Sequence, residues 1–107
     1  MGPALAQNVD TLKASGVCPD CDLRGASLRR LTIEAADLSG ANLREADLKE
    51  AHLPKAKFRG ADLRRTEMEY SVVDEADFSD SHLAQVDLEK ASANSADFSG
   101  SDARRAD

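Results

Sequence analysis

Large apolar residues recur at every fifth position of this 107-residue chain. A small residue stands two positions before nearly every apolar centre, and the other three positions of each unit are mostly polar or glycine. An amphipathic helix repeats its apolar face every 3.6 residues and a half-buried strand every two, so neither produces this pattern. The frame predicts a single repeat domain over residues 21–107, preceded by a tail and capping segment over residues 1–20. The centres are Leu23, Leu28, Ile33, Leu38, Leu43, Leu48, Leu53, Phe58, Leu63, Met68, Val73, Phe78, Leu83, Leu88, Ala93, Phe98 and Ala103.

A second period of twenty residues lies on top of the first. The chain has three phenylalanines, and Phe58, Phe78 and Phe98 follow Leu38 at intervals of twenty. Four five-residue sides therefore make one coil, and residues twenty apart should stack at the usual inter-strand spacing of about 4.8 Å. This predicts about four coils, with an aromatic ladder along one inner face. A row of glycines at the following corner has the same interval and suits a turn that needs permissive backbone angles: Gly40, Gly60 and Gly100, interrupted by Asp80.

The segment before the repeats has the signals of a short helix. Asn8 is a candidate N-cap, Val9 and Leu12 make an apolar stripe, and Gly16 is a stop signal. We expect a helix around Val9 to Ser15 that covers the first coil. The last coil has no such cover, so fraying, a longer native chain, or a dimer formed through this end are all open alternatives.

Composition narrows the classes of function. The net charge is −6 and the sequence pI is about 4.8, which argues against direct nucleic-acid binding and against docking on anionic membranes. The apolar runs are far too short for membrane insertion. Ala4-Leu5-Ala6 resembles the end of a signal-peptidase site. The compartment is therefore cytoplasmic, or periplasmic or lumenal if that segment is the remnant of a signal peptide.

Candidate chemistry is sparse. Cys18 and Cys21 form a CxxC, which is open to three interpretations: two buried structural residues, a disulfide, or a metal or redox site. His52 and His82 fall on opposite faces of the predicted coil and do not complete a zinc site with the cysteines. There is no phosphate loop, metal motif or catalytic set in the sequence. We expect no cofactor and no enzymatic activity.

The repeat units carry a family resemblance. Residues 36–40 read ADLSG, residues 41–45 read ANLRE and residues 61–65 read ADLRR. They resemble the A(D/N)LxX signature of the pentapeptide-repeat family. The resemblance implies an all-β fold, a right-handed quadrilateral β-helix in which the centre and the small residue two before it point inward and the other three face solvent.

The outward positions suggest a role in interaction. Acidic rows alternate with an arginine row that contains Arg24, Arg44, Arg64 and Arg104. We expect a non-catalytic solenoid that binds an unknown protein partner. The alternative is an acidic, DNA-like rod, because the quinolone-resistance members of the pentapeptide-repeat family are understood to bind DNA gyrase in that way. The candidate acidic surface comprises Asp22, Asp62, Asp102, Asp47, Glu67 and Asp87.

Overall fold

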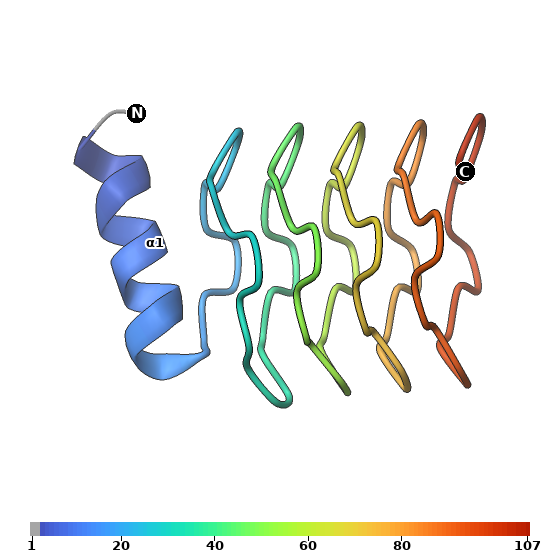
Figure 1. The fold of residues 1–107 in the computed structure, drawn as a ribbon. Helices are drawn as coiled ribbons and strands as arrows, with labels where there is room; N and C mark the ends of the chain where they lie inside the picture. The colour runs from blue at the N-terminus through green and yellow to red at the C-terminus, as the bar shows by residue number, and fades with distance from the viewer. Residues whose placement is uncertain (1–2) are drawn as a thin grey trace.

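The protein is a stack of coils closed at one end by a helix (Figure 1). The structure is a computed structural model that describes the backbone of residues 3–107 and the side chains of residues 5–107. Helix α1 spans Pro3–Ser15, and the chain then winds away from it, so that the C-terminus lies at the far end of the stack. Parallel bridges join residues twenty apart, from Val17↔Asp37 to His82↔Asp102. Four pentapeptides therefore make one coil, as the second sequence period predicts.

Backbone hydrogen bonds connect each side of a coil to its neighbours. The Leu38 N–H donates to the Lys57 carbonyl at 2.8 Å, and the Lys57 N–H donates back to the Ala36 carbonyl at 2.8 Å. A corner follows every five residues, so each side contributes one isolated bridge residue and no extended strand forms. The predicted β-solenoid is therefore built from isolated parallel bridges, with one helix at its end.

Every corner has the same left-handed backbone conformation, whether or not it holds a glycine. The centre carbonyl accepts a hydrogen bond from the N–H three residues later, for example from Ala41 to Leu38 at 3.1 Å. The residue before that donor has positive φ, +61° at Tyr70 and +55° at Asp80. The glycine row marks corners of positive φ, as predicted, but glycine is not required there, because Asp80 adopts the same conformation between Gly60 and Gly100. The left-handed region costs an ordinary residue roughly 1–2 kcal/mol, and the corner hydrogen bonds and coil stacking offset this cost.

The core is a filled column of inward side chains. Phe58 and Phe78 are fully buried, and their ring centroids lie 4.8 Å apart at an interplanar angle of 7°. Phe98 stacks on Phe78 at 4.9 Å, completing the ladder above Leu38, which is also buried. Phe98 is 37% exposed, because the last coil has a neighbouring coil on one side only.

Helix α1 covers the other end of the column. Val9 and Leu12 are buried against the first coil, and Gly16 ends the helix at φ +73° with its N–H bonded to the Leu12 carbonyl. The predicted stop is confirmed, but the predicted start at Val9 is wrong. Helix-favouring residues extend α1 back to Pro3, since proline is tolerated in a first helical turn.

Asn8 is consequently not an N-cap. It lies within α1, and its Nδ2 donates to the Asp22 carbonyl at 3.2 Å, a group that no preceding coil can satisfy. The ladder already begins at Val17, so the solenoid starts earlier than the predicted boundary at residue 21. No helix among residues 3–107 is long and apolar enough to span a bilayer.

Candidate interaction faces

The Asp or Asn of the repeat signature has a structural task. Its side-chain oxygen accepts the backbone N–H two residues later, as from Ser79 to Asp77 at 2.9 Å and from Arg44 to Asn42 at 3.2 Å. These N–H groups point outward and take no part in the backbone ladder, so the side chain supplies the partner they need. All nine Asp or Asn residues at this position do so: Asp22, Asp37, Asn42, Asp47, Asp62, Asp77, Asp87, Asp97 and Asp102.

The candidate acidic surface is divided and largely paired. Asp22, Asp62 and Asp102 form one row, and each binds the arginine two residues later, at 2.8, 2.6 and 2.9 Å respectively. Asp47, Glu67 and Asp87 form a row on the next face. There Arg29 pairs with Asp47 at 2.9 Å and Lys49 with Glu67 at 3.4 Å. The six residues therefore do not make one continuous, unneutralised acidic face.

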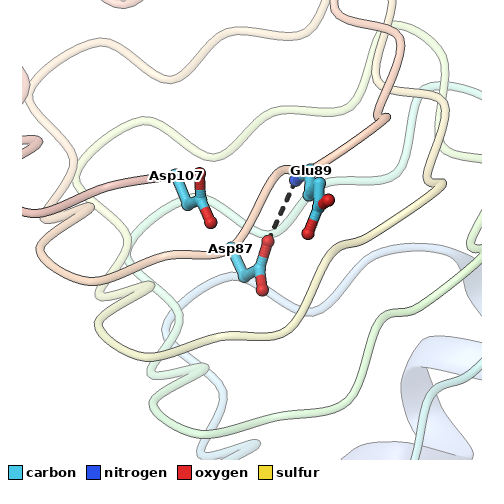
Figure 2. A group of neighbouring side chains, drawn as sticks. All are labelled: Asp87, Glu89 and Asp107. Atoms are coloured by element: carbon cyan, nitrogen blue, oxygen red, sulfur yellow. Dashed lines mark hydrogen bonds between the residues drawn. The ribbon is translucent and has the colours of Figure 1, made fainter.

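Asp87 belongs to a small acidic cluster near the last coil. Figure 2 shows Asp87, Glu89 and Asp107, whose carboxylate oxygens lie within 4.8 Å of one another. The Glu89 N–H donates to Asp87 at 3.0 Å. Oxygen groups of this kind suit Ca²⁺ or Mg²⁺, but Ca²⁺ takes six to eight ligands, and these three carboxylates lie on the open surface of the rod. The cluster is not a complete metal site.

Local hydrogen bonds and ion pairs lower the pKa of several aspartates and so favour their ionised form. The Arg64 guanidinium, hydrogen-bonded to Asp62, lowers the pKa of that carboxyl group. Hydrogen bonds from Ser39 lower the pKa of Asp37, and those from Ser92 and Asn94 lower the pKa of Asp74. A general acid needs a raised pKa. In the described part of the chain, each carboxyl group whose pKa is clearly shifted has it lowered and not raised.

These pKa shifts predict acid sensitivity. A carboxyl group whose folded-state pKa lies below its unfolded value of about 3.9 stabilises the fold above that pH and loses its contribution as pH falls through the folded-state pKa. The free energy of unfolding should therefore fall steeply below about pH 4, which urea titrations at several pH values can measure. Asp37→Asn keeps a turn acceptor, as Asn42 does natively, and should flatten the slope. A constant unfolding free energy from neutral to acidic pH would contradict this.

The two cysteines lie where the helix meets the first coil. Cys18 and Cys21 are joined as a disulfide with Cα atoms 5.4 Å apart, and Cys18 is fully buried. The bond spans the first corner, where the Cys21 N–H also donates to the Cys18 carbonyl. His52 and His82 occupy ladder rows half a coil apart. The structure therefore does not bring the four residues together as a zinc site.

The face that holds the predicted arginine row also contains Arg65 and Arg105, and it carries a surplus of positive charge that the row alone did not indicate. We call its six arginines the arginine edge; beside them lie four carboxylates, Asp22, Glu45, Asp62 and Asp102, which leaves this face at +2 in a chain of net charge −6. Counting charges separately for each side of the twenty-residue coil would have revealed the edge. The arginine edge comprises Arg24, Arg44, Arg64, Arg65, Arg104 and Arg105.

Two open hollows lie along the arginine edge. One, of about 340 Å³, is lined by Arg24, Gly25, Arg44 and Glu45. The other, of about 290 Å³, is lined by Ala84, Gln85, Arg104 and Arg105. Arginines supply most of the polar groups of both hollows, with one carboxylate, Glu45, in the first, and guanidinium groups of this kind suit anionic groups.

Comparisons with known proteins agree with this architecture. A pentapeptide repeat protein of the Arabidopsis thaliana thylakoid lumen has a solved structure that matches 99% of this chain and 71% of its own, at 28% identity and a TM-score of 0.70. A pentapeptide repeat protein of Nostoc PCC 7120 matches 85% of this chain and 78% of its own, at 25% identity and a TM-score of 0.58.

A weaker likeness concerns QnrB1, a plasmid-mediated fluoroquinolone resistance protein. Its structure matches 84% of this chain and 61% of its own, at 21% identity and a TM-score of 0.42, and this carries no argument about function. No curated protein sequence matches the chain. The family model for pentapeptide repeats matches residues 18–44, 33–69 and 74–107, with eight copies. The chain therefore belongs to the pentapeptide-repeat family.

Proposed function

We propose that this protein is a non-catalytic interaction module whose outer faces bind a protein partner. The observation that carries the proposal is that inward residues form the core while outward residues form regular exposed rows. Inward side chains from Leu23 to Leu83 fill the column, while the outward rows stand in register along the stack. A filled rod with regular rows of side chains presents extended faces, which repeat solenoids use for binding.

The shape and electrostatics argue against catalysis. Ligand and active sites are concave pockets with a few converging polar groups. The two hollows are open to solvent, and arginines supply most of their polar groups. The carboxylates whose pKa is clearly shifted are held ionised on outer faces. A group with a matched acid or base pKa, which enzymatic proton transfer requires, is not among them.

A DNA-like binding mode toward gyrase has less support. Such a mode needs a continuous negative surface, whereas five of the six candidate acidic residues pair with a lysine or arginine. We expect the protein neither to inhibit gyrase supercoiling nor to protect gyrase from quinolones. Inhibition that is lost when Asp47 and Asp62 are replaced by Asn would overturn this expectation, because Asn retains the turn acceptor and removes only the charge.

Affinity capture with matched surface variants tests the proposal. The intact chain, immobilised by one terminus, should retain a partner from native lysate. Replacing charged residues on one face should abolish retention while the same change on another face leaves it intact. Circular dichroism should show that both variants remain folded. If the folded wild-type protein retains no partner, or if all face variants retain it equally, the proposal of a specific interaction face is contradicted.

A further inference from the structure

We propose that the arginine edge binds an extended acidic segment of the partner protein, laid along the axis of the rod. The proposal rests on the interaction-module function above and names the chemistry of its partner. It follows from three features of this face: the arginines that lack a carboxylate partner, the two hollows, and the distance between those hollows.

Half of the arginines in the edge are neutralised within the chain. Arg24, Arg64 and Arg104 each bind the Asp two residues earlier. The equivalent position before Arg44 holds Asn42, which cannot neutralise it, and the buried Nε of Arg44 has no hydrogen-bond partner. The charge of Arg44 acts on Asp62, which is already paired with Arg64. Arg65 bonds only the neutral amide of Gln85, at 3.0 Å.

Arg44, Arg65 and Arg105 therefore have no ion-pair partner among residues 5–107. A guanidinium presents its donors in a fork that matches a carboxylate. The charge left on this face consequently favours carboxylate groups supplied by another molecule.

Each hollow contains one paired and one unpaired arginine. The hollow near α1 has Arg24 and Arg44, and the hollow near the last coil has Arg104 and Arg105. The space beside Gly25 in the first hollow is open, since a Cβ at this corner would meet no other atom within 4 Å. In each hollow the paired arginine keeps its own Asp as a counter-ion, so the unpaired arginine is the one available to an incoming carboxylate.

The spacing of the hollows suits an extended strand. They lie at equivalent corners three coils apart, which is about 14 Å at an inter-strand spacing of about 4.8 Å. A strand rises about 3.4 Å per residue and alternates its side chains, so residues four apart lie about 14 Å apart on one face. Acidic residues at positions n and n+4 of an extended segment would therefore reach both hollows together.

Two blocked peptides test this register. Acetyl-Glu-Thr-Val-Thr-Glu-amide has its carboxylates four residues apart, and acetyl-Glu-Thr-Val-Glu-Thr-amide has them three apart on opposite faces of a strand. Titration of the isotope-labelled full chain, followed by amide and arginine side-chain NMR at low salt, gives site and affinity. The first peptide should shift signals of Arg44 and Arg105 and bind several-fold more tightly than the second. High salt should abolish binding.

Variants separate local from overall charge effects. Arg44→Gln with Arg105→Gln should weaken binding of the first peptide roughly tenfold, as expected for two charge-assisted contacts. Lys55→Gln with Lys57→Gln removes the same charge from other faces and should change affinity little. Glu45→Gln, which removes the carboxylate from the first hollow, should strengthen binding.

Several results would overturn the proposal. They are an absence of shifts on the arginine edge, equal affinity for both peptides, equal weakening by both double variants, or equally tight binding of inorganic tripolyphosphate. Concentration-dependent self-association that is lost in the arginine variant would assign the edge to a second copy of the chain instead. If the Arg44→Gln, Arg105→Gln variant still captures the partner of the wild-type chain, the proposal that the arginine edge binds that partner fails, but the protein-binding function stands. If no partner is captured from lysate but the peptide with glutamates four residues apart still binds more tightly, the proposal of a protein-binding function fails and the edge proposal stands.

Discussion

Replacing Phe78 by Asp should prevent the chain from folding as one cooperative unit. Phe78 is fully buried, and aromatic rings stack on both sides of it at 4.8 and 4.9 Å. The change removes roughly 1.5–3 kcal/mol of apolar burial. It also places a carboxylate where no cation lies, at an effective cost of several kcal/mol. Together these losses match the 5–15 kcal/mol that typically stabilises a domain.

Circular dichroism and chemical denaturation measure this effect. Phe78→Leu is the matched control, because Leu38 occupies the same row natively, and volume-similar apolar replacements usually cost under about 1.5 kcal/mol. Tyr70→Asp adds the same charge at an exposed corner of the opposite side of the coil and should leave the fold intact. A Phe78→Asp protein that melts cooperatively near the wild-type temperature would show that the column tolerates charge.

Ala76→Val should be the second most damaging of the changes considered. Ala76 is buried on the same side of its coil as Phe78. Its ladder row contains only alanine: Ala36, Ala56, Ala76 and Ala96. The phenyl rings take the volume that larger neighbours would need, and hydrogen bonds between coils hold the backbone in place. Two extra methyl groups should therefore overpack the column at a cost of about 1–3 kcal/mol.

Ala46→Val is the control for this substitution. Ala46 is equally buried, but its ladder row already contains two β-branched residues, Thr66 and Val86, so the surrounding space admits a branched side chain. Urea unfolding should show a clearly smaller loss of stability for Ala46→Val than for Ala76→Val. Equal losses would mean that the phenyl rings do not set the space available in the alanine row.

The disagreements between sequence and structure share a cause. The helix starts at Pro3 and not near Val9, and Asn8 lies inside it, where its Nδ2 donates to the Asp22 carbonyl of the first coil. The residue type of Asn8 indicates a local helix cap, whereas its contact with the first coil determines what its side chain binds. The glycine row correctly marked corners of positive φ, but the coil geometry imposes positive φ on every corner residue, whatever its type.

The number of acidic residues in a row does not show which of them are neutralised by a neighbouring cation. Asp22 and Asp87 occupy the same signature position, and both accept a backbone N–H. Asp22 is neutralised by Arg24, whereas Asp87 faces Glu89 and Asp107. Only the identity of the neighbours in space separates a structural carboxylate in an ion pair from one in a repulsive cluster.

Inward and outward positions follow from the amino-acid order alone, because a burial pattern with periods of five and twenty is compatible with a column whose backbone turns a corner every five residues. Which charged side chains pair with one another could not be obtained in this way. The ion pairs of Arg29 with Asp47 and Lys49 with Glu67 join residues eighteen apart. Side-chain pairing across neighbouring coils therefore decided which charges remain available to a partner, since electrostatic interactions depend on distance in space and not on position in the chain.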